Sequence, residues 1–180
     1  SGIGMAVLET CLREKVSAVL ALGRDTAKLD DLLQRYPSAK GWGRIIPIAA
    51  DFHDPAGLDI AMERVGDFQG AIDGVVLSAG IDKTLPFGIT TEKTITEVLH
   101  LNTMVPLELI RRLLKAGRLK GSASIILVSS VMGLVGQPGK AAYCASKSAL
   151  IGAAKVLALE LAPQRIRVNV VAPGVVETPL

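Results

Sequence analysis

The chain has 180 residues, of which 49% are hydrophobic and 21% are charged, which suits one globular domain with a buried core. Its net charge of +3 comes from interspersed charges without a basic cluster, which argues against binding of nucleic acid. Charges or glycines interrupt the apolar runs well short of the ~18 residues of a membrane span. The two cysteines make neither a disulfide framework nor a metal site. We therefore expect no metal, no membrane and no nucleic-acid partner and, because no signal peptide is recognised, a cytoplasmic location.

The predicted elements alternate between helices and strands along the whole chain. Apolar runs rich in β-branched residues predict strands, and apolar residues at helical spacing predict the segments between them. In chain order we expect a helix from 5 to 12, a strand from 17 to 22, a helix from 26 to 36, a strand from 45 to 50, a helix from 55 to 68, a strand from 72 to 77, a helix from 91 to 116, a strand from 123 to 128, a helix from 141 to 161 and a strand from 165 to 172. This alternation is typical of an α/β fold with a doubly wound parallel sheet.

Two residues are expected to interrupt the long helix from 91 to 116. Pro106 removes one backbone donor, so helical hydrogen bonding should break locally near it. Asn102 lies in the same stretch, where an asparagine is otherwise usually a surface residue. The segment immediately precedes the strand from 123 to 128, which makes Asn102 a candidate site residue.

Serine, tyrosine and lysine side chains are predicted to meet beyond that strand. Ser130 follows it at the carboxyl end, where open α/β sheets place their ligands. Tyr143 and Lys147, four residues apart, share one face of the next helix. A phenol with a pKa near ~10 is a poor acid or base at neutral pH, and a nearby ammonium favours the phenolate. We expect Tyr143 to be a general acid or base and Ser130 to bind the substrate oxygen; for Tyr-x-x-x-Lys alone, a buried tyrosine beside a solvated lysine is the alternative.

The run Tyr-Cys-Ala-Ser-Lys, with Ser130 thirteen residues before Tyr143 (143 − 130 = 13), resembles the short-chain dehydrogenase/reductase family, and most of all its 3-oxoacyl-carrier-protein reductase-like members. The resemblance covers nearly the whole chain. It implies a Rossmann-type fold in three α/β/α layers and NAD(P)(H)-dependent oxidoreduction between a carbonyl and an alcohol, hence a small-molecule substrate. It further implies that Lys147 holds the nicotinamide ribose and that Asn102, in a kinked helix, anchors a water that relays protons.

Cofactor-binding positions follow from the same resemblance. Arg24, twenty residues after Gly4 (24 − 4 = 20), lies where such folds bind the adenosine ribose. It suits a 2′-phosphate, which favours NADP(H) and leaves NAD(H) open; a solvated arginine at a turn is the alternative. The expected cofactor-binding residues are Ser1, Gly2, Ile3, Gly4, Arg24, Asp51, Phe52, Ser78, Ala79, Gly80, Tyr143, Lys147, Pro173, Gly174, Val176 and Thr178.

The chain departs from the family pattern after the strand from 72 to 77. The family usually shows Asn-Asn-Ala-Gly there, whereas this chain has Leu77 and Ser78 before Ala79 and Gly80. The small Ala79-Gly80 pair still lets the backbone approach the cofactor. The hydrogen bonds that the two asparagine side chains would make are in question.

Residues 1–180 are expected to form a single domain that is incomplete at both ends. In the strand order 3-2-1-4-5-6 the first strand lies in the middle of the sheet, and it should precede Ser1. The family also has a substrate lid after the Pro173-Gly174 turn. The apolar helix patterns from 105 to 114 and from 149 to 161 could form a self-complementary interface, so we expect a homodimer or homotetramer.

Two other classes of function remain open. A non-catalytic Rossmann protein that senses a dinucleotide would not need Ser130, Tyr143, Lys147 and Asn102 together. A nucleotide-sugar epimerase or dehydratase can share Tyr-x-x-x-Lys. The Ser-Ala-Gly turn and the Pro-Gly-x-x-x-Thr stretch favour the simpler dehydrogenases.

Overall fold

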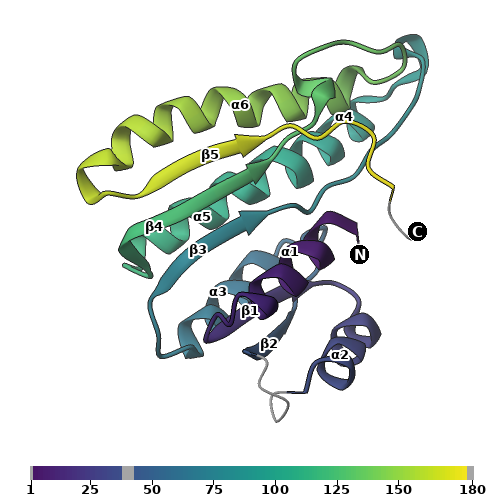
Figure 1. The fold of residues 1–180 in the computed structure, drawn as a ribbon. Coiled ribbons are helices and arrows are strands. Elements are labelled where there is room, and N and C mark those ends of the chain that lie inside the picture. Colours follow the sequence, from purple (N-terminus) through teal and green to yellow (C-terminus); the bar gives the residue numbers. More distant parts are fainter. Residues whose placement is uncertain (1, 38–42, 178–180) are drawn as a thin grey trace. The chain divides into compact units, whose positions relative to one another are not determined.

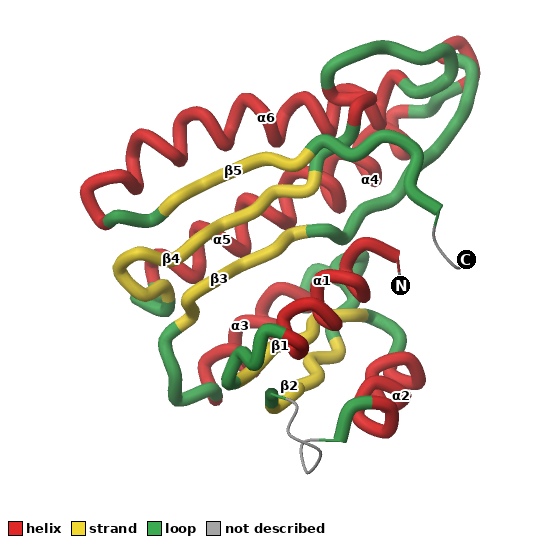
Figure 2. The backbone as a smooth tube through the Cα atoms, viewed as in Figure 1, coloured by secondary structure: helices red, strands yellow, loops and turns green. Residues whose placement is uncertain are grey.

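A computed structural model describes residues 2–37 and 43–177, which form two compact units (Figure 1). The N-terminal unit consists of Ser1–Gln69 with Glu177–Leu180, and the C-terminal unit of Gly70–Val176. Helices and strands alternate in both, as the sequence predicts (Figure 2).

The N-terminal unit is built around two parallel strands. Its elements are α1 (Gly2–Arg13), β1 (Ala18–Gly23), α2 (Thr26–Arg35), β2 (Arg44–Ala49) and α3 (Gly57–Asp67). Leucines from α1 and α2 pack against Ile45 of β2 to form its core, together with Val19 and Ala21 of β1. Ile48 lies three residues beyond Ile45 and so faces the other side of the strand pair, and α3 packs against β2.

Local sequence explains where the helices of this unit begin. Gly2 has φ +56°, a left-handed conformation that favours glycine, and α1 begins at this residue. Asp25 caps α2, since its carboxylate accepts a hydrogen bond of 3.1 Å from the backbone N–H of Lys28.

The C-terminal unit has three parallel strands in the order β3-β4-β5. They are β3 (Ile72–Leu77), β4 (Leu119–Val128) and β5 (Arg167–Val171), and β4 begins four residues before the predicted start. Its main helices are α4 (Glu92–Leu99), α5 (Val105–Lys115) and α6 (Ala141–Leu161), with single 3₁₀ turns at Phe87–Ile89, Val131–Gly133 and Ala162–Gln164. Ile110 of α5 and Leu150 of α6 belong to one core cluster with Ile125 and Leu127 of β4. These two helices therefore cover one face of the three-strand sheet.

The long predicted helix is interrupted by a π-helical turn, His100–Met104, between α4 and α5. The backbone N–H of Val105 donates to the carbonyl of His100, five residues earlier. Pro106 lies in the first turn of α5, where a missing N–H is tolerated. The interruption expected near Asn102 is confirmed, and a π turn is a form often found at functional sites.

The described strands pair into two sheets, β1-β2 and β3-β4-β5. These are the pairings that the order 3-2-1-4-5-6 gives for its strands other than the first. The parallel sheets and flanking helices are those of an α/β Rossmann-type fold, as predicted. The further strand expected ahead of Ser1 stays a prediction.

Helix α6 is apolar on average in spite of its charged residues. By length and composition alone, Ala141–Gln164 is the one stretch of the described residues that would suffice to cross a membrane. The sequence argument required an uninterrupted apolar run, and Lys147 and Lys155 break that run without making the helix polar on average. Leu150, Ala154 and Leu161 pack in the core against the sheet, as in the core helix of a globular protein.

Candidate active site

Ser130 lies at the carboxyl end of β4, where the strand gives way to the 3₁₀ turn Val131–Gly133. It caps that turn, and its hydroxyl oxygen accepts a hydrogen bond of 3.1 Å from the backbone N–H of Met132. The side chain is largely buried. The hydroxyl hydrogen is not engaged by this bond, so Ser130 keeps a donor for a ligand.

Tyr143 and Lys147 lie on the first turns of α6, and the structure brings them together. The Nζ atom of Lys147 is 5.8 Å from the centroid of the Tyr143 ring. This ammonium also donates a hydrogen bond of 2.9 Å to the carbonyl of Val128, the last residue of β4. Burial lowers the pKa of Lys147, because a desolvated ammonium is disfavoured. The lysine is therefore a fixed, desolvated group beside the phenol and not a solvated surface charge.

Sequence reasoning missed a second cation at the same ring. Lys140 precedes α6, and its Nζ atom is also 5.8 Å from the ring centroid of Tyr143. Its ammonium forms an ion pair with Asp82, which lies in the segment after β3. The spacing of three residues between Lys140 and Tyr143 was the available signal. The partner Asp82, 58 residues away, left none.

Asn102 joins three segments of the C-terminal unit through its side chain. Its Oδ1 accepts from the backbone N–H of Ile81 at 2.8 Å, and its Nδ2 donates to the carbonyl of Ile81 at 2.9 Å. The same Nδ2 donates to the hydroxyl of Ser146 on α6 at 3.0 Å. Asn102 thereby fixes the segment after β3, where the family's two asparagines are replaced. Its backbone carbonyl lacks the donor four residues on, because Pro106 has no N–H.

Gly80 is required by this packing. A Cβ atom at Gly80 would lie 2.9 Å from Oδ1 of Asn102 and 3.3 Å from Nζ of Lys147. Any side chain there would displace one of these two groups. The neighbouring Ala79 and Gly80 are both exposed, while Ser78 is half-buried.

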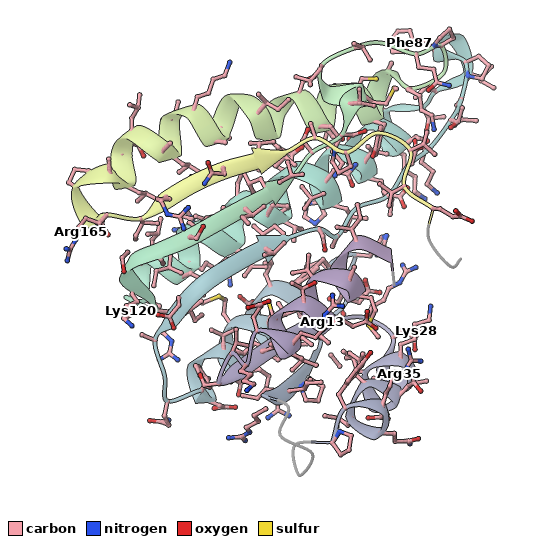
Figure 3. The ribbon with its side chains drawn as sticks, viewed as in Figure 1. Arg13, Lys28, Arg35, Phe87, Lys120 and Arg165 are labelled. Carbon is pink, nitrogen blue, oxygen red and sulfur yellow. The ribbon has the colours of Figure 1, made fainter. Side chains whose placement is uncertain are left out.

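The segment after β5 meets the turn after β4. The backbone N–H of Val131 donates to the carbonyl of Pro173 at 2.8 Å. Gly174 and Val176 follow and are exposed. Figure 3 shows the exposed Phe87 at the end of the unit toward which the strands point, and Lys120 and Arg165 at the opposite end. The carboxyl-end edge thus combines the buried polar groups with exposed apolar ones.

The other predicted positions belong to the N-terminal unit. Gly2, Ile3 and Gly4 form the first turn of α1. Gly23 pairs with Ala49 in the parallel sheet, so Arg24 and Asp51 follow neighbouring strand ends at one edge. Ser1 and Thr178 lie outside the described residues, and Phe52 is half-buried beside Asp51.

A histidine that sequence reasoning did not single out holds Asp51. The Asp51 carboxylate accepts from the backbone N–H of His53 at 3.0 Å and pairs with its ring Nδ1 at 2.9 Å. These bonds lower the pKa of Asp51, and the charge of Arg24 adds a smaller effect in the same direction. Arg24 and Asp51 are both exposed.

Comparison with known proteins identifies the class. A family model for the short chain dehydrogenases matches residues 1–180. The 3-oxoacyl-[acyl-carrier-protein] reductase FabG of Thermotoga maritima is 34% identical over 183 residues, which cover 100% of this chain and 72% of that protein. FabG of Salmonella typhimurium is 32% identical over 178 residues, covering 98% and 70%.

Solved structures agree. A short-chain dehydrogenase from Streptomyces avermitilis superposes with a TM-score of 0.88 at 34% identity, covering 99% of this chain and 64% of that one. The landomycin C-6 ketoreductase LanV with bound NADP gives 0.86 at 25% identity, covering 96% and 71%. The 4-hydroxyisoleucine dehydrogenase complexed with NADH and succinate gives 0.83 at 27%, covering 98% and 73%.

The fold and these relatives define an oxidoreductase that depends on a nicotinamide cofactor. The chain belongs to the short-chain dehydrogenase family.

Proposed function

We propose that this protein is a carbonyl reductase or alcohol dehydrogenase that prefers NADP(H) and in which Tyr143 exchanges the proton with the substrate oxygen. The observation that carries the proposal is the position of Lys147. Its ammonium is buried, bonded to the carbonyl of Val128 and held 5.8 Å from the Tyr143 ring. A lysine without a role beside the phenol would extend into solvent and avoid the cost of desolvation.

The proposed chemistry assigns one role to each residue. Ser130 donates its hydroxyl hydrogen to the substrate oxygen and holds it at the phenol. Tyr143 protonates that oxygen in reduction and takes the proton back in oxidation. Lys147 favours the charged state of the phenol and holds the nicotinamide ribose, and the carbonyl of Asn102 anchors a relay water. The nicotinamide, when bound, supplies or accepts the hydride.

The residues present fit such a cofactor in each unit. In the C-terminal unit, the exposed Gly80 lets the backbone lie close to Asn102 and Lys147, where a Cβ atom would collide with the Asn102 side chain. We assign Ser78, Ala79, Pro173, Gly174 and Val176 to the same end of the cofactor, together with Thr178.

In the N-terminal unit, the first turn of α1 offers unpaired backbone N–H groups to a pyrophosphate. We assign Ser1, Gly2, Ile3 and Gly4 to that role, and Asp51 and Phe52 to the adenine. Arg24 would bind the 2′-phosphate of NADP(H) with a charge-assisted hydrogen bond.

For the substrate we propose a 3-oxoacyl thioester. The support is the similarity to the FabG reductases, and the exposed apolar Phe87, Ile89 and Leu134 near the carboxyl end of the strands suit an acyl chain. NADP, which is bound in the LanV structure, agrees with the proposed role of Arg24. The enzyme would act in the cytoplasm.

We further propose a homodimer or homotetramer formed through α6. Only 28% of the most apolar 18-residue stretch of this helix is buried. Val156 and Leu159 are exposed by 54% and 77%. Apolar area of this kind favours a partner surface. Light scattering at micromolar concentration tests this, and a monomer would contradict it.

An assay of the full chain tests the function. Oxidation of NADPH and of NADH is followed with 3-oxoacyl thioesters and simple ketones, and the products formed from nucleotide sugars are analysed directly. We expect turnover of the thioesters with NADPH. Turnover of nucleotide sugars alone would favour an epimerase or dehydratase, and cofactor binding without any turnover would favour a dinucleotide sensor.

A further inference from the structure

Two consecutive carbonyls of α6 each accept a hydrogen bond from a side-chain hydroxyl. Thr103, in the π-helical turn, donates from Oγ1 to the carbonyl of Ser146 at 3.0 Å. Ser129, at the end of β4, donates from Oγ to the carbonyl of Lys147 at 2.8 Å. Both donors are buried, with 7% and 4% exposure. Two elements far apart in the sequence thus bind the same point of the helix.

These bonds are not needed to satisfy the two carbonyls. Ser146 and Lys147 lie in the interior of α6, which ends at Leu161, so their carbonyls already have the backbone donors four residues on. The hydroxyls add a second bond to each. The effect of these two extra bonds is therefore to hold α6 in one position.

The geometry of an α-helix shows what two such bonds fix. Consecutive residues are rotated by about 100° around the axis and displaced by about 1.5 Å along it. A donor from the π-helical turn and a donor from the residue that follows β4 therefore hold the helix from two directions, against rotation and against sliding. Tyr143 lies one turn before Lys147 on that helix, and Ser130 is the residue after Ser129.

Close packing reinforces the contact on the β4 side. A Cβ atom at Gly133 would lie 2.8 Å from Oγ of Ser129 and 3.0 Å from the carbonyl oxygen of Lys147. Ser148 donates from its hydroxyl to the carbonyl of Gly133 at 2.8 Å. The turn that follows Ser130 therefore lies directly against the helix at Lys147.

We propose that Thr103 and Ser129 are positioning residues, which set the distance and angle between Tyr143 and Ser130 by holding the backbone of α6. This inference rests on the proposed function, because it concerns the same reaction. A misplacement of ~1 Å remote from the chemistry can reduce the rate about a hundred-fold. Loss of either hydroxyl should therefore lower kcat and leave cofactor binding nearly unchanged.

The test compares hydroxyl loss with shape loss in the full chain. Thr103→Val keeps the branched shape and removes the hydroxyl, whereas Thr103→Ser keeps the hydroxyl. We expect kcat to fall about ten- to a hundred-fold in Thr103→Val and in Ser129→Ala, with KM for NADPH within about two-fold of the parent value. Thr103→Ser should recover most of the rate.

Thr10 provides the matched control, because its Oγ1 also donates to a helix carbonyl, that of Ala6, at 2.8 Å. Thr10→Val should keep kcat and KM. Full activity of Thr103→Val, equal losses in Thr103→Val and Thr103→Ser, or failure of both hydroxyl-deleted variants to fold would overturn the proposal. Tyr143→Phe separates the two hypotheses: if it stays active the proposed function fails, and if it is inactive while Thr103→Val is active only this inference fails.

Discussion

The two units hold their polar candidate residues in different ways. In the C-terminal unit, Asn102, Ser129 and Lys147 are buried, and each side chain is hydrogen-bonded to the backbone of another element. In the N-terminal unit, Arg24 and Asp51 are exposed at the ends of strands. The difference corresponds to the two tasks proposed for them. Proton transfer needs groups fixed within fractions of an ångström, whereas binding of a charged cofactor needs accessible charge.

This contrast predicts that substitutions in the C-terminal unit change the rate and that those in the N-terminal unit change cofactor choice. The largest effect should come from Tyr143→Phe. Loss of the proton donor should reduce kcat at least about a hundred-fold, while the affinity for NADPH, measured by fluorescence titration, stays within about two-fold. Tyr36→Phe removes the other tyrosine hydroxyl, which is bonded to Glu9, and is the control. Retention of more than about a tenth of kcat, a loss under ~1.4 kcal/mol, would contradict the assignment of Tyr143.

Lys147→Ala should have the next largest effect, and it should change both kcat and KM for the cofactor. Lys147 is assigned to the phenol and to the nicotinamide ribose, so kcat should fall and KM for the cofactor should rise, each about ten-fold or more. Steady-state kinetics measure both. Lys155→Ala on the same helix, two turns further and exposed, should change neither. A normal KM for the cofactor in Lys147→Ala would argue against its contact with the ribose.

Arg24→Ala, in the N-terminal unit, should change the preference between NADPH and NADH. Loss of the guanidinium should weaken NADPH binding about ten-fold or more and NADH binding far less, because only the 2′-phosphate loses a charge-assisted partner. Ratios of kcat/KM for the two cofactors measure this. Arg35, whose exposed side chain is labelled in Figure 3, provides the control Arg35→Ala. Equal losses for both cofactors would exclude the proposed role.

The smallest effect expected is on stability and concerns Lys147. Burial lowers its pKa below the ordinary 10.5, so between the two values the unfolded chain binds more protons than the folded one. The unfolding free energy should therefore rise with pH across that window, and the cost of the buried charge is complete below the folded pKa. Lys147→Met should lack this rise when denaturant unfolding is compared at about pH 7 and about pH 10. Identical pH dependence in Lys147→Met and the parent would mean that the lysine is not desolvated in solution.

Much of the fold could be predicted because it depends on local patterns. The bounds of α6 and β3 agree with the apolar runs that predict them, and the remaining elements differ mainly at their ends. The pairing of Tyr143 with Lys147 follows from helical spacing alone. Period and spacing are properties of neighbouring residues, which the sequence displays directly.

The remaining part of the site depends on contacts between distant residues. Thr103 reaches Ser146 across 43 positions, and Asn102 reaches Ile81 across 21. A hydroxyl that bonds to a helix carbonyl leaves no periodic signal, and neither does the pairing of Lys140 with Asp82. Asn102 was expected to anchor a relay water, and the bonds of its side chain could not be read from its position in a helix.

The π-helical turn makes the site depend on the number of residues between His100 and Met104 as well as on which residues they are. A turn with bonds to the fifth residue back contains one more residue than an α-helical turn. Removing any single residue between His100 and Met104 would allow one continuous α-helix, and the residues on one side of the deletion would rotate by about 100° relative to those on the other. Asn102 and Thr103 could then no longer both face Ser146. Point substitutions in this turn therefore test individual contacts. A one-residue deletion would instead break the contacts of Asn102 and Thr103 with Ser146 together, although the helix itself would become more regular.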